Sequence, residues 1–255
     1  MNHKQVFDLP DEDYSMTNSL TAAVATARAL KLVLEYAGIG FELEEGPAVG
    51  GCRLRLTPSA AHPWTHGDVR AHLLAEGITV EVARLEEPLP CPGHELLLTL
   101  PSGQEVRALG RLLETGLTEV QNAALQLHRA LARIGVERHL DIQTMGSRAL
   151  IDIGMFDTGA ATLLCRSLGG NESVLCDLDL GDWHDHERFA RELQRVVTAT
   201  GDVLLVESVP TCGHCLGRHG GNRIRFDYLD ADDALLLADT LHRTTASAGS
   251  VRPGN

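Results

Sequence analysis

Basic residues, aromatic residues and long hydrophobic runs are all scarce in this chain of 255 residues. Lys and Arg number 22 against 35 Asp and Glu, and the formal charge is -13 at pH 7. Such a field repels a phosphate backbone, and no local basic cluster offsets it, so we expect no nucleic-acid partner. No apolar run approaches the roughly 18 residues that span a bilayer, so we expect no membrane-spanning helix.

The beginning of the chain also lacks the basic and apolar regions of a signal peptide, because "MNHKQVFDLPDEDYSM" is polar and acidic. We therefore expect a cytoplasmic protein, with residues 1–16 and 244–255 as flexible tails. In a reducing compartment its cysteines should be thiols that are buried, metal-bound or catalytic rather than disulfides. There are six of them: Cys52, Cys91, Cys165, Cys176, Cys212 and Cys215.

Apolar spacing gives an order of elements for the first half of the chain. Ala and Leu at helical spacing predict a helix over residues 19–39, with Gly38 as its stop signal. Alternation predicts a strand over 51–58, helical spacing returns over 66–78, and two strands over 79–85 and 94–100 surround a Pro-rich loop. A helix over 103–116 completes this half.

The second half of the chain repeats much of this order. One shift matches Leu20 with Leu117, Leu30 with Leu127 and Gly38 with Gly135, and a second constant shift matches Cys52 with Cys176, Leu54 with Leu178, Leu56 with Leu180, His62 with His186, Val82 with Val206 and Cys91 with Cys215. We predict an α+β fold of two internally duplicated helix-strand-helix-strand-strand-helix units, residues 17–115 and 116–243, related by a pseudo-twofold axis. Extra meander strands are expected over 139–172.

The densest group of reactive side chains is "PTCGHCLGRHGG", residues 210–221, between two predicted strands. Its CGHC resembles the active dithiol of thioredoxin-like proteins, and the resemblance implies a thiol-disulfide oxidoreductase using Cys212 and Cys215. In that family the first Cys begins a helix, whose dipole stabilises the thiolate. Here three glycines in the following seven residues oppose a helix, and only about 40 residues remain for the rest of that fold.

A metal site is the alternative that we favour for this segment. A Cys-x-x-Cys turn brings two thiolates to one ion, and His219 supplies a third ligand. Cys91 and His94 form a Cys-x-x-His in the corresponding loop of the first half. These five residues, Cys212, Cys215, His219, Cys91 and His94, are our predicted zinc ligands. A Gly-rich turn with incidental thiols explains the segment almost as well.

These observations predict a zinc-binding α+β protein that acts as a binding or assembly module for an unidentified protein or small-molecule partner. A closed site made by both loops would hold structural zinc. Cys212, Cys215 and His219 with a water would instead leave an open site, as in a zinc-dependent hydrolase. The open-site hydrolase and the CGHC oxidoreductase are therefore the enzymatic alternatives.

Three other motifs are weaker. The Asp-Thr-Gly at residues 157–159 resembles the catalytic loop of retropepsin-like aspartic proteases, but there is no second copy, and a meander turn explains it. In "GDWHDHERF", His184 and His186 lie among carboxylates, and we prefer a helix capped by Asp182 or Asp185 to a metal or acid-base cluster. "GGNRIRF" lacks both glycine-rich nucleotide patterns and leads into a strand, so we assign it no nucleotide site.

Overall fold

The computed structural model describes residues 12–46, 50–58, 65–85, 95–201, 204–209 and 221–248, without the side chains of residues 12–20 and 245–248. The chain divides into two compact units, Met1–Leu117 and Thr118–Asn255. Both contain helices and antiparallel strands, so the predicted α+β class is confirmed. Within the described ranges, no helix is long and apolar enough to cross a membrane.

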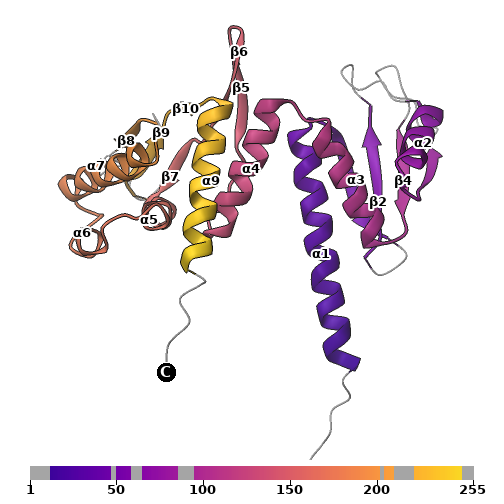
Figure 1. The fold of residues 1–255 in the computed structure, drawn as a ribbon, viewed down its shortest axis with the longest axis horizontal. Coiled ribbons are helices and arrows are strands. Elements are labelled where there is room, and N and C mark those ends of the chain that lie inside the picture. Colours follow the sequence, from indigo (N-terminus) through magenta and orange to yellow (C-terminus); the bar gives the residue numbers. More distant parts are fainter. Residues whose placement is uncertain are drawn as a thin grey trace, which may run out of the picture. The chain divides into compact units, whose positions relative to one another are not determined.

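The first unit contains three helices and one sheet over its described residues (Figure 1). Its elements are α1 (Glu12–Tyr36), β1 (Gly40–Glu45), β2 (Cys52–Thr57), α2 (His66–Ala75), β3 (Glu81–Arg84), β4 (Leu96–Leu100) and α3 (Gly103–Thr115). All neighbouring strands are antiparallel, in the order β1-β2-β4-β3, and α1 packs along α3.

The core of this unit lies on one face of its sheet. Register pairs Leu54 with Leu98 and Leu56 with Leu96, and since side chains alternate along a strand, these leucines point to the same side. The helices add buried residues to the same cluster, namely Leu30, Leu34, Leu73, Val106 and Leu109. Burial on one face fixes the register of the sheet, because a slip of one residue would expose every leucine.

The strand β1 was not predicted. The observed order of this unit is therefore helix-strand-strand-helix-strand-strand-helix instead of the predicted helix-strand-helix-strand-strand-helix. Only Phe41 and Leu43 of "GFELEE" pack against the core, and four of the six residues are exposed. An acidic edge strand has few apolar residues because one long side of it faces water. Its apolar signal is therefore too short to separate it from a loop.

The second unit has more elements and two small sheets (Figure 1). Its elements are α4 (Glu119–Arg133), β5 (Asp141–Met145), β6 (Arg148–Asp152), β7 (Met155–Asp157), α5 (Thr158–Ser167), α6 (Glu172–Cys176), α7 (Trp183–Ala199), β8 (Val206–Val209), β9 (Arg223–Phe226), β10 (Tyr228–Leu229) and α9 (Ala231–Ala248). The strand orders are β10-β6-β5 and β7-β9-β8, all antiparallel.

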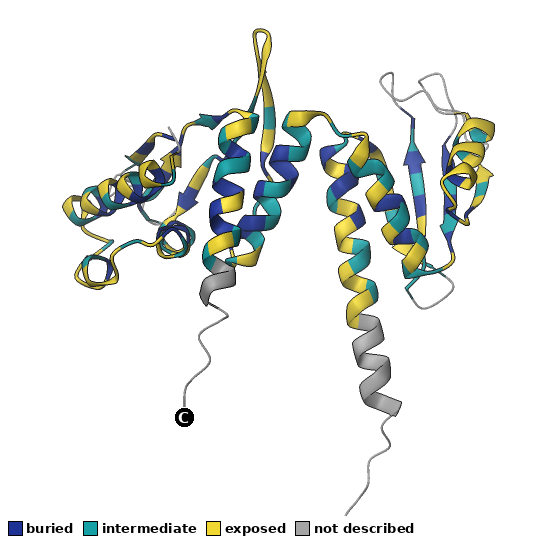
Figure 2. Cartoon of the chain, viewed as in Figure 1, coloured by how far each residue is buried: buried dark blue, intermediate teal, exposed yellow. Residues whose placement is uncertain are grey.

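Helices α4 and α9 pack against each other through their buried faces (Figure 2). The α4 face is made of Ala and Leu, which allows close approach, and α9 contributes Ala234, Leu237, Ala238 and Leu241. A capping box fixes the start of α4: the Thr118 amide donates to Gln121 Oε1 at 2.9 Å, and the Gln121 amide donates to Thr118 Oγ1. Such caps satisfy the free amides of the first turn.

Three predictions for the second unit are wrong. Cys176 ends α6, and Leu178 and Leu180 lie outside any strand, so the constant shift that placed them on β2 does not hold there. The residues 139–172 form β5, β6 and β7 as expected, but then α5 and the first residue of α6 instead of further strands. Asp157 is not in a meander turn, because its side chain accepts a hydrogen bond from the Ala160 amide and begins α5.

Candidate functional site

The five predicted zinc ligands, Cys91, His94, Cys212, Cys215 and His219, lie outside the described residues. The flanking strands are described. Residues 86–94 link β3 to β4, and residues 210–220 link β8 to β9, so each segment joins two antiparallel neighbours. Among the residues that the structure does describe, no three His, Cys, Asp or Glu side chains come together to hold a metal ion.

The cap at the start of α7 is confirmed. The Asp182 side chain accepts from the amides of His184 and Asp185, at 2.9 and 3.2 Å. His184 is exposed, whereas His186 is fully buried, with Nδ1 2.7 Å from Ser208 Oγ and no described partner for Nε2. Burial lowers the pKa of His186, which keeps its ring neutral. The two histidines therefore have different environments and do not form one cluster.

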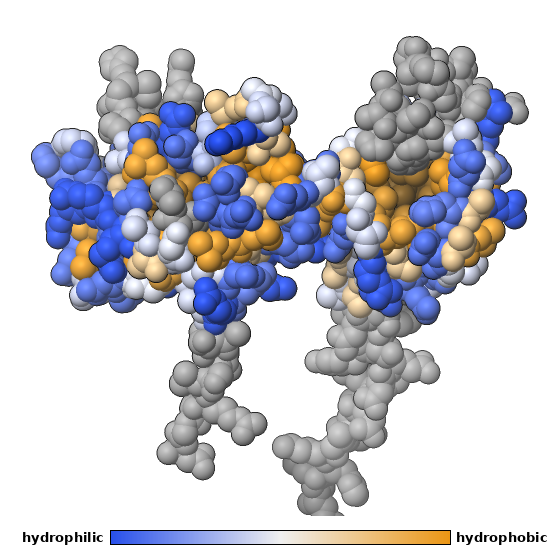
Figure 3. Space-filling model, turned by 45° about the horizontal axis from the view of Figure 1, so that its top comes forward, coloured by the Kyte–Doolittle hydropathy of each residue, from blue (hydrophilic) through white to orange (hydrophobic). Residues whose placement is uncertain are grey.

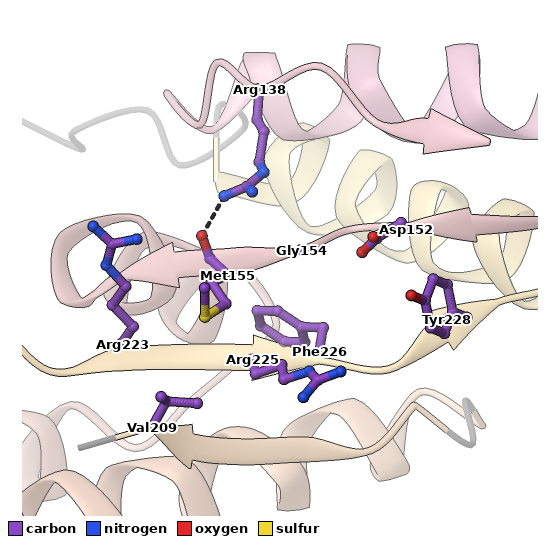
Figure 4. Close-up of a pocket in the computed structure, with 9 residues that line it drawn as sticks. All are labelled: Arg138, Asp152, Gly154, Met155, Val209, Arg223, Arg225, Phe226 and Tyr228. Atoms are coloured by element: carbon purple, nitrogen blue, oxygen red, sulfur yellow. Dashed lines mark hydrogen bonds between the residues drawn. The ribbon is translucent and has the colours of Figure 1, made fainter. Parts of the chain in front are cut away.

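An open pocket of about 470 Å³ lies on the second unit (Figure 4). Its wall comes from the strands β6 to β10 and from the segment between α4 and β5. The lining residues are Arg138, Asp152, Gly154, Met155, Val209, Arg223, Arg225, Phe226 and Tyr228. This volume is in the range of small-molecule sites. Three arginines against one aspartate make the lining cationic in a chain that is strongly acidic overall.

The pocket is built on two long strands that bend at the same place. Tyr228 pairs with Asp152 and Arg225 with Met155, so the two ladders share one register. The amide of Phe226 also donates to the carbonyl of Gly154 at 3.2 Å between them. Thus β6 with β7 forms one bent strand, and β10 with β9 forms its bent partner.

Burial changes phase at this bend. Ile151 and Ile153 are buried two residues apart, but the next buried residue of that strand, Phe156, comes three residues later. The partner strand shows the same change, from Phe226 to Leu229. Because a strand alternates its faces with a period of two, the change places side chains from both halves of the bent ladder on one exposed surface.

Gly154 makes room for Arg138 at the bend. Its φ is +74°, and a Cβ added there would stand 2.4 Å from Nη2 of Arg138. The Arg138 guanidinium donates to the carbonyl of Met155 (Figure 4). It also lies 5.5 Å from the ring centroid of Phe156. Since β9 is the only described strand that pairs with β7, Arg138 occupies the free edge of β7. A backbone bond and a ring contact fix this cation before any ligand arrives.

The strand β9 supplies the other two arginines. Ile224 and Phe226 are buried, whereas the alternating Arg223 and Arg225 lie on the outer face. Arg225 is exposed and makes no ion pair with a described residue. A guanidinium presents a planar fork of N–H donors that matches carboxylate or phosphate oxygens.

A polar group closes the other end of the pocket. Gln143 donates through Nε2 to Asp152 Oδ2 at 2.9 Å and accepts from the Tyr228 hydroxyl at 3.4 Å. Val209 lies opposite Arg223, and Met155 lies opposite Arg225, between Arg223 and this polar group (Figure 4). Along the ladder the surface therefore offers Arg223 with Val209, then Arg225 with Met155, then Asp152 with Tyr228.

The first unit has a different kind of hollow. A groove of about 180 Å³ runs between α1 and α3 and is lined mainly by aliphatic atoms of residues such as Ala29, Val33 and Val106. Figure 3 shows that hydrophobic surface also gathers in a hollow on the drawn face of this unit. Neither feature gathers side chains of one charge as the pocket of the second unit does, so we take that pocket as the candidate site.

Comparison with protein-family models, with curated proteins and with solved structures found no match for this chain. The sequence did draw attention to Arg223 and Arg225, but only as part of a nucleotide motif that is not there. Arg138, Gly154 and Tyr228 were missed. The one signal that could have indicated them is the apolar spacing of two and then three residues around Gly154.

Proposed function

We propose that this chain is a binding module and that its second unit binds an anionic ligand in the arginine pocket. The observation that carries the proposal is the fixed position of Arg138 over Gly154, beside two outward-facing arginines of β9. Such prearranged donors bind anions well because little side-chain freedom is lost on binding. Salt screens the attraction between the exposed arginines and an anion, so affinity should fall as the ionic strength rises.

Calorimetric titration of the full chain with sodium phosphate at low ionic strength tests this function. We expect saturable binding that Arg225→Gln weakens about tenfold, since one charge-assisted hydrogen-bonding group is lost. Arg148→Gln is the matched control, because Arg148 is exposed on β6 of the same unit and does not line the pocket. Binding that does not saturate, or that both substitutions weaken equally, would show that the pocket is not the site.

We also propose zinc binding by Cys212 and Cys215, with His219 as a third ligand. Two antiparallel strands, β8 and β9, enter and leave the segment that carries these residues, and a short connection keeps its two cysteines near each other. Cys91 and His94, in the connection from β3 to β4, stay predicted ligands. The enzymatic alternatives, an open-site hydrolase and a CGHC oxidoreductase, depend on the same segment and also stay predictions.

Elemental analysis tests the zinc proposal. The purified chain should contain stoichiometric zinc, and joint replacement of Cys212 and Cys215 by Ser should remove it. Cys176→Ser is the control, since Cys176 is an exposed free thiol on α6. Wild-type protein that stays free of zinc after supplementation would contradict the proposal.

We further propose that the two units arose by duplication. Counting each bent strand once, both have a helix, two strands, a helical segment, two strands and a helix, although the helical segment is α2 alone in the first unit and α5, α6 and α7 in the second. In both, the fourth strand lies between the second and third. The first helices also end alike, with Gly38 and Gly135 at positive φ and 97 residues apart, as the first sequence shift requires. An experimental structure in which the seven common elements do not superpose would refute the duplication and its pseudo-twofold axis.

A further inference from the structure

The phase change at Gly154 places a carboxylate on the same surface as the arginines. In an unbroken alternation, Asp152 and Tyr228 would lie on the face opposite Met155 and Arg225. Because buried positions shift by one residue in both strands at the bend, Asp152 and Tyr228 are instead half-exposed and line the pocket with Arg225. The site therefore has two ends of opposite charge.

The distance between these ends suits a short ligand. Arg225 and Asp152 belong to register pairs three residues apart along the ladder, which is about 10 Å at strand spacing. The Arg225 guanidinium points toward the Tyr228 end (Figure 4), so its own side chain spans part of this separation. A linker of a few atoms covers the rest.

The guanidinium donors of the pocket indicate which anion it fits. Three arginines and Asp152 line it, and the exposed Asp157 and Glu207 pair in register with Arg223 and Arg225 and offset part of their charge. A phosphate monoester, with a charge of about -1.5 to -2 at pH 7 and three acceptor oxygens, binds such donors more strongly than a single carboxylate does. At the other end, Gln143 occupies Oδ2 of Asp152, and Oδ1 accepts no hydrogen bond from a described residue. That oxygen can accept one from a ligand.

We propose that the arginine pocket binds a small phosphate monoester whose far end carries an amino or hydroxyl group. The phosphate lies against Arg225, beside Met155 on the neighbouring strand, and the far group donates to Asp152. This inference rests on the proposed anion-binding function and adds the polarity of the ligand. It makes Asp152 the residue that selects among phosphate monoesters.

Two probes of similar size test the selection in the full chain. O-phosphoethanolamine carries an ammonium group that ethyl phosphate lacks, while both carry the same phosphate. We expect O-phosphoethanolamine to bind the wild-type chain about tenfold more tightly, because it makes one additional charge-assisted hydrogen bond. Asp152→Asn should abolish this preference without weakening ethyl phosphate, and Arg225→Gln should weaken both probes by the same factor.

The outcomes separate the two proposals. If both phosphates bind the wild-type chain equally, or if the preference survives Asp152→Asn, the selection by Asp152 is refuted and the anion site stands. If neither phosphate binds, the anion site itself is refuted. Circular dichroism of each variant checks that it folds. Tyr228→Phe removes only a hydroxyl bonded to Gln143, so this variant should still bind O-phosphoethanolamine more tightly than ethyl phosphate, by a smaller factor than wild type.

Discussion

Replacing Gly154 with alanine perturbs the pocket where its packing is closest. A residue with a Cβ at φ near +74° is destabilised by about 1–2 kcal/mol. The new Cβ would stand 2.4 Å from Arg138 Nη2, so the guanidinium must move and lose its hydrogen bond to the Met155 carbonyl. At this half-exposed position that bond contributes about 1 kcal/mol. The free energy of unfolding of the second unit should therefore fall by about 2–3 kcal/mol.

Gly146, at the turn between β5 and β6, provides the matched control. Its φ is +65°, and an added Cβ would meet nothing within 4 Å. Gly146→Ala should therefore cost only about 1–2 kcal/mol, from backbone strain. In an Arg138→Ala background, where the clash is gone, Gly154→Ala should cost no more than Gly146→Ala. This double-mutant cycle isolates the contact between the bend and the arginine.

Urea unfolding followed by tryptophan fluorescence measures these changes. The chain has two tryptophans, Trp64 in the first unit and Trp183 in the second, so a Trp64→Phe background reports the second unit alone. Gly154→Ala should also weaken phosphate binding, whereas Gly146→Ala should not. If both glycine substitutions destabilise equally, or if Arg138→Ala leaves the effect of Gly154→Ala unchanged, the packing of Arg138 against the bend has no energetic role.

Regular apolar periodicity made much of the fold predictable. The strands β2 and β4 and the helices α3 and α7 were expected where they occur, because each buries one face against a core. The α1 helix was expected over residues 19–39 but begins at Glu12, within the segment predicted as a flexible tail. The stop of α1 at Gly38 was also expected, and there the Ile39 amide donates to the Leu34 carbonyl at 3.1 Å. Local signals succeed where the burial pattern and the terminating residue agree.

The errors arose where short-range hydrogen bonding decides the structure. Asp157 and Gly159 are typical of a turn, but the Asp157 carboxylate bonds the Ala160 amide and begins α5. A cap and a turn use the same residue types, since both depend on an Asx side chain that accepts a nearby amide. The choice between them depends on the downstream Ala161 and Leu164, which are buried in the second unit.

The pocket could not be derived from the sequence because its parts meet only through long-range pairing. The change of apolar spacing at Gly154 is visible in the chain, but its partner Phe226 lies about 70 residues later, beyond the helices α5, α6 and α7 and the strand β8. Only the register of Asp152 with Tyr228 shows that both strands change phase together. Arg138 belongs to neither strand, and its place at the free edge of β7 follows from where α4 ends and β5 begins.

Two further predictions concern buried titratable groups. The first is tested by a brief N-ethylmaleimide pulse at pH 7.5 followed by mass spectrometry. Cys176 should be modified because it is exposed, whereas Cys52 and Cys165 should stay unmodified because burial raises the pKa of each thiol to about 11. Early labelling of either buried thiol would contradict this. The last prediction is that His186 makes folding sensitive to acid. Burial lowers its pKa in the folded chain, so the unfolded chain binds the proton more tightly, and the stability from His186 is complete above its ordinary pKa near 6.5 and is lost as the pH falls below it. As the pH is lowered from 7 to 5, the free energy of unfolding of wild type should therefore fall by about 1 kcal/mol more than that of His186→Leu. Urea unfolding at each pH measures this difference. His184→Leu is the control, since His184 is exposed and its removal should leave the pH dependence almost unchanged. Parallel pH profiles for wild type and His186→Leu would mean that His186 is hydrated or can move when it takes up a proton.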